Sequence, residues 1–204
     1  MSVVKGSYGE TYCKQNSISY QYYEPDPSTS SSMREYSLKD GPFTVKLDES
    51  KYNILVSGMQ TSEAAVIRSG IDADMFESYM NMTNKSLLMF DINKQIPTEF
   101  DISIRIKDEK YADVDLRECT ASDATMILNN IYTGFGSTAS NKEIVTINGV
   151  PYLKFAWMDG SELRYATIIN SDMIYIWATR DNGMVTADDT ELLLQVVESI
   201  AYPN

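Results

Sequence analysis

The side chains that most often carry out catalysis are scarce in this sequence. It contains no histidine, which excludes a Ser-His-Asp triad, a Cys-His nucleophile pair and a zinc ion held by imidazole. The run Gly134-Phe135-Gly136-Ser137 has the glycines of a phosphate-binding loop. It follows a predicted helix, however, whereas a phosphate-binding loop opens one, so it cannot present a helix N-terminus to phosphate. The sequence therefore predicts no catalytic residue and no cofactor.

Acidic residues offer the remaining catalytic chemistry. A glycosidase uses two carboxyl groups about 5 to 10 Å apart beside the bound sugar. The acids and indole rings that could line such a cleft are Glu143, Asp159, Glu162, Asp172 and Asp181 with Trp157 and Trp177. Most of these acids fall at predicted turns or strand edges, where acids are ordinary, and no feature marks one as buried with a raised pKa. A carboxylate-based hydrolase is therefore a disfavoured alternative.

Two short acidic runs begin as a calcium-binding loop would. They are Asp72-Ala73-Asp74 and Asp113-Val114-Asp115. Neither continues with the further acid, the glycine and the distal glutamate that a wrapped loop needs. A solvated acidic surface accounts for both runs. We therefore predict no metal site.

The chain has two cysteines, Cys13 and Cys119. One pair cannot build a four-cysteine metal site or a disulfide-rich scaffold. A bridge between them would close a long loop and stabilise the fold by about 4 to 5 kcal/mol in the chain-entropy model. The sequence does not show that the two thiols approach each other. A Cys13–Cys119 disulfide and two unpaired thiols both stay open, and the second is the more ordinary outcome.

Net charge narrows the range of partners. Asp and Glu number 29 against 17 Lys and Arg, which gives a formal net charge of −12. This field repels phosphate backbones and anionic membrane surfaces, and no run of basic residues interrupts it. We therefore expect no nucleic acid as a partner. We expect an unknown protein or peptide instead, and a basic protein or peptide fits the charge best. Acidity also keeps a protein soluble without any partner.

The N-terminal residues differ in composition from the rest of the chain. Apolar and polar residues alternate over 18–22, which predicts one short strand. The proline- and serine-rich run over 25–32 predicts a flexible connector. We divide the chain into an N-terminal arm and Ser/Pro-rich tether, residues 1–36, and a domain, residues 37–204. No stretch approaches the roughly 20 apolar residues of a membrane span, and no signal peptide is recognisable.

The first half of the domain mixes strand and helix patterns. Apolar patterns predict strands over 43–47, 52–56 and 64–67. A helix is predicted after the capping residue Asp72, with Phe76 and Met80 on its apolar face. Further helical turns are predicted over 84–90.

The second half is patterned more regularly. Strict alternation predicts a strand over 100–107, and a helix is predicted between Thr120 and Gly134. Four further strands, joined in part by Asn-Gly and Asp-Gly turns, are predicted over 143–147, 150–158, 163–170 and 173–179. Thr186 caps a final helix whose apolar stripe must lie on the sheet. The fold class is α+β: a curved antiparallel sheet with a C-terminal four-strand meander, packed by helices.

This order of elements resembles the PsbP-like family, whose fold is shared with the Ran-binding Mog proteins and the DcrB-type bacterial lipoproteins. The segments that carry the resemblance are Gly70–Met80, Asn84–Leu88, Ile147–Tyr152 and Thr186–Ile200. They are similar to small surface or lipoprotein domains of Gram-positive bacteria over roughly residues 40 to 202. Residues 1–36 have no counterpart, and no lipobox precedes the domain. The motifs consist of capping, turn and core residues, so they indicate fold more than function.

The resemblance implies an uncharacterised, non-enzymatic binding or accessory module that is extracytoplasmic or at the cell surface. We expect a partner site on the sheet face that the helices leave uncovered. The meander-strand residues expected there are Trp157, Tyr165, Tyr175 and Trp177. The alternative is a cytoplasmic chaperone or immunity-type protein that masks a basic effector. That role suits the negative charge, and the DcrB-like fold is known among secretion-effector chaperones.

Overall fold

The structure is a computed structural model of the 204-residue chain. It describes residues 2–3, 8–22, 33–38, 41, 43–60, 63–108 and 111–202. The chain divides into two compact units, Met1–Ser32 and Met33–Asn204. Each unit has secondary structure of its own.

The first unit contains a short helix between two short strands. Helix α1 (Tyr8–Gln15) lies in the chain between β1 (Ser2–Val3) and β2 (Gln21–Tyr22), and the two strands pair in parallel. The strand predicted over 18–22 is present only as β2, and the sequence analysis did not predict α1. The predicted connector, 25–32, lies outside the described residues.

The second unit is built on a sheet in which seven strands are described, each antiparallel to its neighbours. In spatial order these are β5 (Tyr52–Val56), β6 (Leu87–Asp91), β7 (Phe100–Asp108), β11 (Asp172–Arg180), β10 (Glu162–Ile169), β9 (Val150–Trp157) and β8 (Ala139–Ile147). A separate hairpin pairs β3 (Met33–Ser37) with β4 (Thr44–Asp48). A backbone bridge between Thr44 and Ala201 ties that hairpin to the C-terminal segment. The α+β class and the antiparallel sheet are thus confirmed.

Two tight turns of this sheet use left-handed backbone conformations. Asn148 and Gly149, between β8 and β9, have φ of 51° and 81°. Asn170 and Ser171, between β10 and β11, have φ of 49° and 72°. Two successive residues with positive φ form the hairpin turn whose twist matches that of the strands. The first turn was predictable from its Asn-Gly pair, whereas the Asn-Ser pair lacks the glycine and gives a weaker signal.

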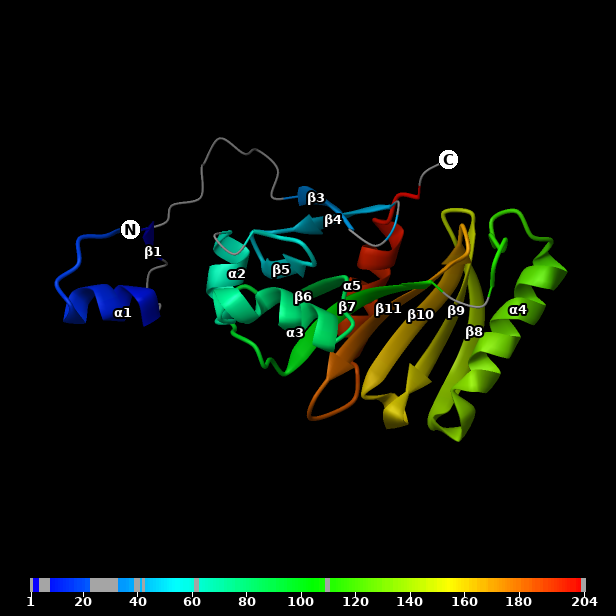
Figure 1. Ribbon diagram of the computed structural model, residues 1–204. Helices are drawn as coiled ribbons and strands as arrows, with labels where there is room; N and C mark the ends of the chain where they lie inside the picture. Colours follow the sequence, from blue (N-terminus) through cyan, green and yellow to red (C-terminus); the bar gives the residue numbers. More distant parts are fainter. Residues whose placement is uncertain are drawn as a thin grey trace. The chain divides into compact units, whose positions relative to one another are not determined.

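One face of the sheet carries the larger core. Helix α5 (Ala187–Glu198) and the β3–β4 hairpin pack on this face, and α5 lies behind β11 in Figure 1. Ile174 and Ile176 of β11 are at most 1% exposed there, against Leu193 and Val196 of α5. The apolar stripe predicted for the last helix therefore lies on the sheet.

Two groups of helices pack on the opposite face. Helices α2 (Ala64–Ser69) and α3 (Phe76–Met82) pack on β5 and β6, at one end of the sheet. Helix α4 (Ala121–Gly134) packs at the other end, over β8 and β9. The two groups are separated along the sheet in Figure 1. Among the residues described, no helix is both long and apolar enough to cross a membrane.

Residues 64–67 form helix α2 and not the predicted strand. Two alanines open the segment and favour a helix. Val66 and Ser69, three positions apart, are its buried residues, which gives one inward face with helical spacing. Gly70 ends the helix in the left-handed conformation, with φ of 75°.

The helical turns predicted over 84–90 are also wrong, because 87–91 forms strand β6. Its first four side chains are at most 2% exposed, since Leu87 and Met89 face one core and Leu88 and Phe90 the other. A continuous apolar run does not distinguish a strand buried on both faces from a buried helix.

Helix α5 is tied to β11 by a charged hydrogen-bond network. Thr186 Oγ1 accepts the N–H of Asp189 at 3.2 Å, and Asp189 Oδ2 accepts the N–H of Thr186 at 2.8 Å. Arg180, the last residue of β11, donates from Nε to Asp189 Oδ2 at 2.6 Å and from Nη2 to Oδ1 at 2.9 Å. Burial alone would raise the pKa of Asp189, but hydrogen bonds from Arg180 and Thr186 lower it. The charged carboxylate therefore holds the helix start against the sheet.

We expect Asp189→Asn to lower the free energy of unfolding by about 2 kcal/mol, because Arg180 loses its charged partner. Asp188→Asn, an exposed position in the same helical turn, is the matched control and should change stability by less than about 0.5 kcal/mol. Since the folded-state pKa of Asp189 is lowered, its contribution is present above about pH 4 and is lost as the pH falls through the folded-state pKa. Urea unfolding at pH 7 and pH 3 measures both effects. If Asp189→Asn lowered the free energy of unfolding by the same amount at both pH values, that result would contradict this assignment.

Candidate functional site

Among the described residues of the second unit, no helix packs over the middle of the second sheet face. Helices α3 and α4 lie toward opposite ends of the face, and β11 and β10 run between them in Figure 1. The side chains on this stretch come from β7, β10 and β11. They are Arg105, Arg164, Tyr175, Trp177 and Thr179, which we call the open face.

Antiparallel pairing places these side chains next to one another. Trp177 lies opposite Ser103 on one side and opposite Arg164 on the other. Tyr175 lies opposite Arg105. The Cβ atoms of directly opposite residues are about 5 Å apart. The open face is therefore one continuous surface across three strands.

The two faces of β11 differ in exposure. Ile174, Ile176 and Ala178 point into the first core and are at most 1% exposed. Tyr175 and Trp177, which alternate with them, are partly exposed. Aromatic side chains contribute most when their large area is buried. Tyr175 and Trp177 therefore keep part of their aromatic area available for a partner.

Arg164 lies among three aromatic rings. Its guanidinium carbon is 3.9 Å from the ring centroid of Trp157, 5.3 Å from that of Trp177 and 5.6 Å from that of Phe135. Phe135 and Trp157 also contact each other edge to face, with centroids 5.8 Å apart. These distances suit cation–π attraction. Arg164 thus joins aromatic residues of β9, β11 and the end of α4 into one cluster.

Glu162 is the carboxylate partner of Arg164. Arg164 Nε donates to Glu162 Oε2 at 2.7 Å, and the two side chains are only 14% and 11% exposed. Burial lowers the pKa of Arg164, and the negative charge of Glu162 opposes that shift. Because its carboxylate is already paired with the guanidinium of Arg164, Glu162 is poorly suited to act as a general acid or base.

Arg105 differs from Arg164 in its pairing. Within the part of the chain that the structure describes, Arg105 forms no ion pair and no side-chain hydrogen bond. Lys85 is paired with Asp101, at 3.6 Å, as Arg164 is with Glu162. Burial is the main cause of the lowered pKa of Arg164, and the nearby charge of Arg105 adds to it. The open face therefore carries surplus positive charge on a chain whose net charge is −12.

A hollow of about 190 Å³ adjoins the open face where it meets α4. Its walls come from β11, from the last turn of α4 and from the segment before α4. The lining residues are Tyr111, Asn130, Ile131, Gly134, Phe135, Met173 and Tyr175. Pockets for drug-sized molecules start at about 300 Å³, so this hollow suits a single side chain.

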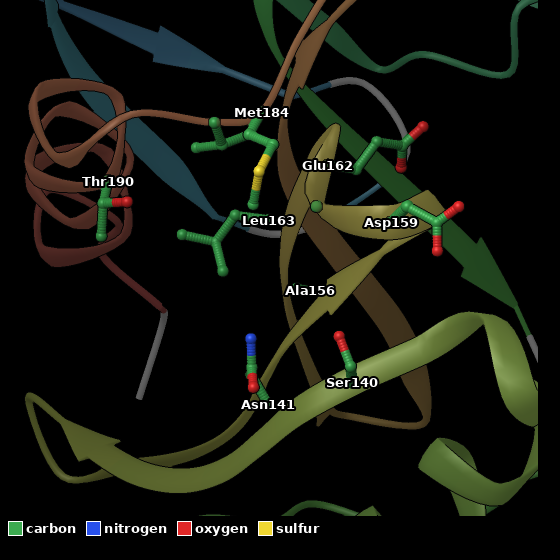
Figure 2. Close-up of a pocket in the computed structure, with 10 residues that line it drawn as sticks. Ser140, Asn141, Ala156, Asp159, Glu162, Leu163, Met184 and Thr190 are labelled. Atoms are coloured by element: carbon green, nitrogen blue, oxygen red, sulfur yellow. The ribbon is translucent and has the colours of Figure 1, made fainter.

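A second pocket, of about 310 Å³, lies between strands β8 to β10 and the segment that leads into α5 (Figure 2). The side chain of Met184 extends toward Leu163, and the carboxylates of Asp159 and Glu162 point away from them. Met184 is 69% exposed. The lining mixes these apolar side chains with the polar groups of Ser140, Asn141 and Thr190, and no single ligand chemistry follows from it.

The structure brings three of the four predicted partner-binding residues together. Trp157, Tyr175 and Trp177 lie on the second face, and Trp157 and Trp177 contact the same guanidinium. Tyr165 lies on the first face, 2% exposed, and packs edge-on against Tyr152 with centroids 6.2 Å apart. Successive residues of a strand point to opposite faces, so Tyr165 is a core residue and not part of the open face.

The other candidate residues do not form a reactive centre. Among the described residues, no three carboxylate or thiol side chains gather as metal ligands would. Glu143 pairs with Lys154 at 3.6 Å. Cys13 belongs to the first unit and Cys119 to the second, so a disulfide between them and two unpaired thiols both stay open. Burial raises the pKa of the Cys119 thiol, which makes it less reactive.

Arg105, Arg164 and Phe135 belong to the site but are not among the residues predicted for it. The alternation over 100–107 indicates that Arg105 points away from the main core, and this is the signal that could have found it. Arg164 sits in an equally regular strand, but its aromatic neighbours come from other elements. Phe135 follows a predicted helix end and carries no such signal.

No model of a known protein family matches this chain, and no curated protein matches it significantly.

We expect Arg164→Ala to lower the free energy of unfolding by about 3 kcal/mol, because Glu162 keeps a buried charge without a partner. Arg105→Ala is the matched control and should stay within about 0.5 kcal/mol, since Arg105 lacks such a partner. The double variant Arg164→Met/Glu162→Leu should recover much of the loss, because it leaves no unpaired charge. Urea unfolding of the three variants measures these differences, and equal losses for Arg164→Ala and Arg105→Ala would refute the ion-pair assignment.

Proposed function

We propose that this protein is a non-enzymatic binding module and that its partner, a polypeptide, binds on the open face. The observation that carries the proposal is the pair of partly exposed aromatic residues, Tyr175 and Trp177, beside Arg105 on a stretch of sheet without a covering helix. Tyr, Trp and Arg are the residue types that contribute most to binding at protein interfaces. On the opposite face of β11, Ile174, Ile176 and Ala178 are at most 1% exposed, so the aromatic area that this strand exposes lies on the open face.

The charge of the open face favours an acidic partner over the basic one expected from composition. A carboxylate placed on Arg105 would make charge-assisted hydrogen bonds in a partly buried site. The negative charge elsewhere on the chain repels an acidic partner, but salt screens charges farther than about 8 Å at physiological ionic strength. The positive charge of the open face therefore determines which partner charge is favoured at the contact. The net charge of the chain mainly affects the association rate.

We also propose the PsbP-like assignment and a location outside the cytoplasm or at the cell surface. Strands β8 to β11 pair in chain order and α5 follows them, which supports the proposed C-terminal meander. The location rests on the resemblance of segments such as Gly70–Met80 to small surface and lipoprotein domains. In this proposal the chain before β3 spaces the domain from another element.

Capture of a partner from labelled cells tests function and location together. Intact source cells are first treated with a biotin reagent that does not cross membranes, and lysate and medium are then passed over immobilised protein. We expect wild type to retain a biotin-labelled polypeptide that Trp177→Thr loses by at least about tenfold, because the indole is the main aromatic contact. Threonine preserves the strand propensity of this position. Ile67→Ser, at an exposed position on α2, is the control and should retain the polypeptide.

Each outcome bears on one part of the proposal. Equal retention by wild type and Trp177→Thr would exclude the open face as the binding site. A Trp177-dependent partner without biotin would overturn the extracytoplasmic location and support the cytoplasmic chaperone or immunity-type role. Far-UV circular dichroism of both variants checks that each is folded.

A further inference from the structure

The hollow beneath α4 and the cation Arg105 lie close enough to contact one stretch of partner chain. Tyr175 lines the hollow, and it lies directly opposite Arg105 in the strand register. Their Cβ atoms are therefore about 5 Å apart. Consecutive residues of an extended chain advance by about 3.5 Å. A partner residue that enters the hollow thus brings its neighbours within one or two positions to Arg105.

The lining of the hollow is mixed, because Tyr111 and Asn130 contribute polar groups beside its apolar side chains. Ile131 from α4, Met173 from β11 and the ring of Phe135 form its apolar walls. Met173 is an adaptable side chain that adjusts to different apolar shapes. The volume of about 190 Å³ accepts one large side chain such as leucine, methionine or phenylalanine. An apolar side chain that enters the hollow gains contact with the ring of Phe135 and with Ile131 and Met173.

The charges around the hollow select the residues beside that anchor. Arg105 has no carboxylate partner within the described part of the chain, whereas Arg164 is already paired with Glu162. Basic residues of a partner would meet the positive charges of Arg105 and Arg164, which is unfavourable. Acidic residues would supply the missing partner of Arg105.

We propose that the open face recognises a short acidic segment of the partner polypeptide. One large apolar residue of the segment enters the hollow beneath α4, and an Asp or Glu within two positions of it binds Arg105. Trp177 continues the surface along β11 and packs against the next residues of the segment. This inference rests on the proposed function and adds the chemistry of the recognised sequence.

Gly134 allows the hollow to be narrowed without damage to the fold. It is the last residue of α4 and lines the hollow. A Cβ placed on it would meet no atom within 4 Å, and alanine is a better helix former than glycine. Gly134→Phe narrows the hollow, and Gly134→Ala is the control for the substitution itself. For charge, Arg105→Glu is matched by Lys94→Glu at an exposed position of the β6–β7 connection.

A random library of displayed 12-residue peptides is the probe. We expect selection on the immobilised full chain to enrich peptides with one leucine, methionine or phenylalanine that has Asp or Glu within two positions. Labelled synthetic versions should bind wild type in fluorescence anisotropy. Arg105→Glu and Gly134→Phe should each weaken binding by at least about tenfold, and Lys94→Glu and Gly134→Ala by less than about twofold.

The remaining outcomes separate this inference from the proposed function. Enrichment of basic peptides overturns recognition of an acidic segment with an apolar anchor. Recognition of an acidic segment is also overturned if Trp177→Thr abolishes peptide binding while Arg105→Glu and Gly134→Phe leave it unchanged. In that case the open face remains the binding site. Failure to select any peptide whose binding depends on Trp177 overturns both proposals. Thermal unfolding checks each variant, and Arg105→Ala replaces Arg105→Glu if the latter does not fold.

Discussion

A seven-stranded sheet has two faces to cover, and the described helices of this domain cover the second face only toward its two ends. Helix α5 and the β3–β4 hairpin pack over the first face, where Ile104 and Ile176 in the middle of the sheet are fully buried. On the second face, α2 and α3 pack over β5 and β6, and α4 packs over β8 and β9. The uncovered stretch falls on β7, β11 and β10. On this stretch aromatic and charged side chains replace aliphatic ones, because it is a surface between two apolar cores.

The pairing of charges then determines which side chains of this stretch are fixed in place and which one is left to bind a partner. The Arg164–Glu162 pair is buried, and an apolar pair of similar size would serve stability equally well or better. What it adds is a fixed arrangement, because one guanidinium contacts the rings of Trp157, Trp177 and Phe135. Aromatic side chains held in place before binding lose less conformational freedom when a partner arrives. Arg105, which lacks such a pairing among the described residues, is left as the group that a partner can satisfy.

Much of the fold could be predicted because local signals and tertiary packing agree. Regular alternation marks β7 and the last four strands, and Thr186 with the following apolar stripe marks α5. The misses at 64–67 and 84–90 have different causes. Over 64–67 the segment is too short to show its helical spacing, since Val66 and Ser69 are the buried residues of α2. The run 87–90 is buried on both faces, and a continuous apolar run is equally compatible with a strand and with a buried helix. Only the surrounding elements decide between the two.

The candidate site was predicted in part for a similar reason. The sequence places aromatic residues on the last strands, but strand parity alone does not say which face the helices cover, so Tyr165 was grouped with residues of the opposite face. The role of Arg105 depends on which carboxylates approach it, and that is a property of the assembled sheet. The hollow combines Phe135 from a helix end with Tyr175 from a strand about 40 residues later in the chain, and no local pattern joins them.

Hydroxyl-radical footprinting with mass spectrometry tests most directly whether the middle of the second face is open in solution. The unmodified full chain contains its own references, because Tyr165 and Tyr152 lie on the first face and are 2% and 1% exposed. We expect Tyr175 and Trp177 to be oxidised in the folded protein, and Tyr165 and Tyr152 to react only after unfolding. Protection of Tyr175 and Trp177 equal to that of Tyr165 would mean that another part of the chain covers the face, and would contradict its assignment as the binding surface.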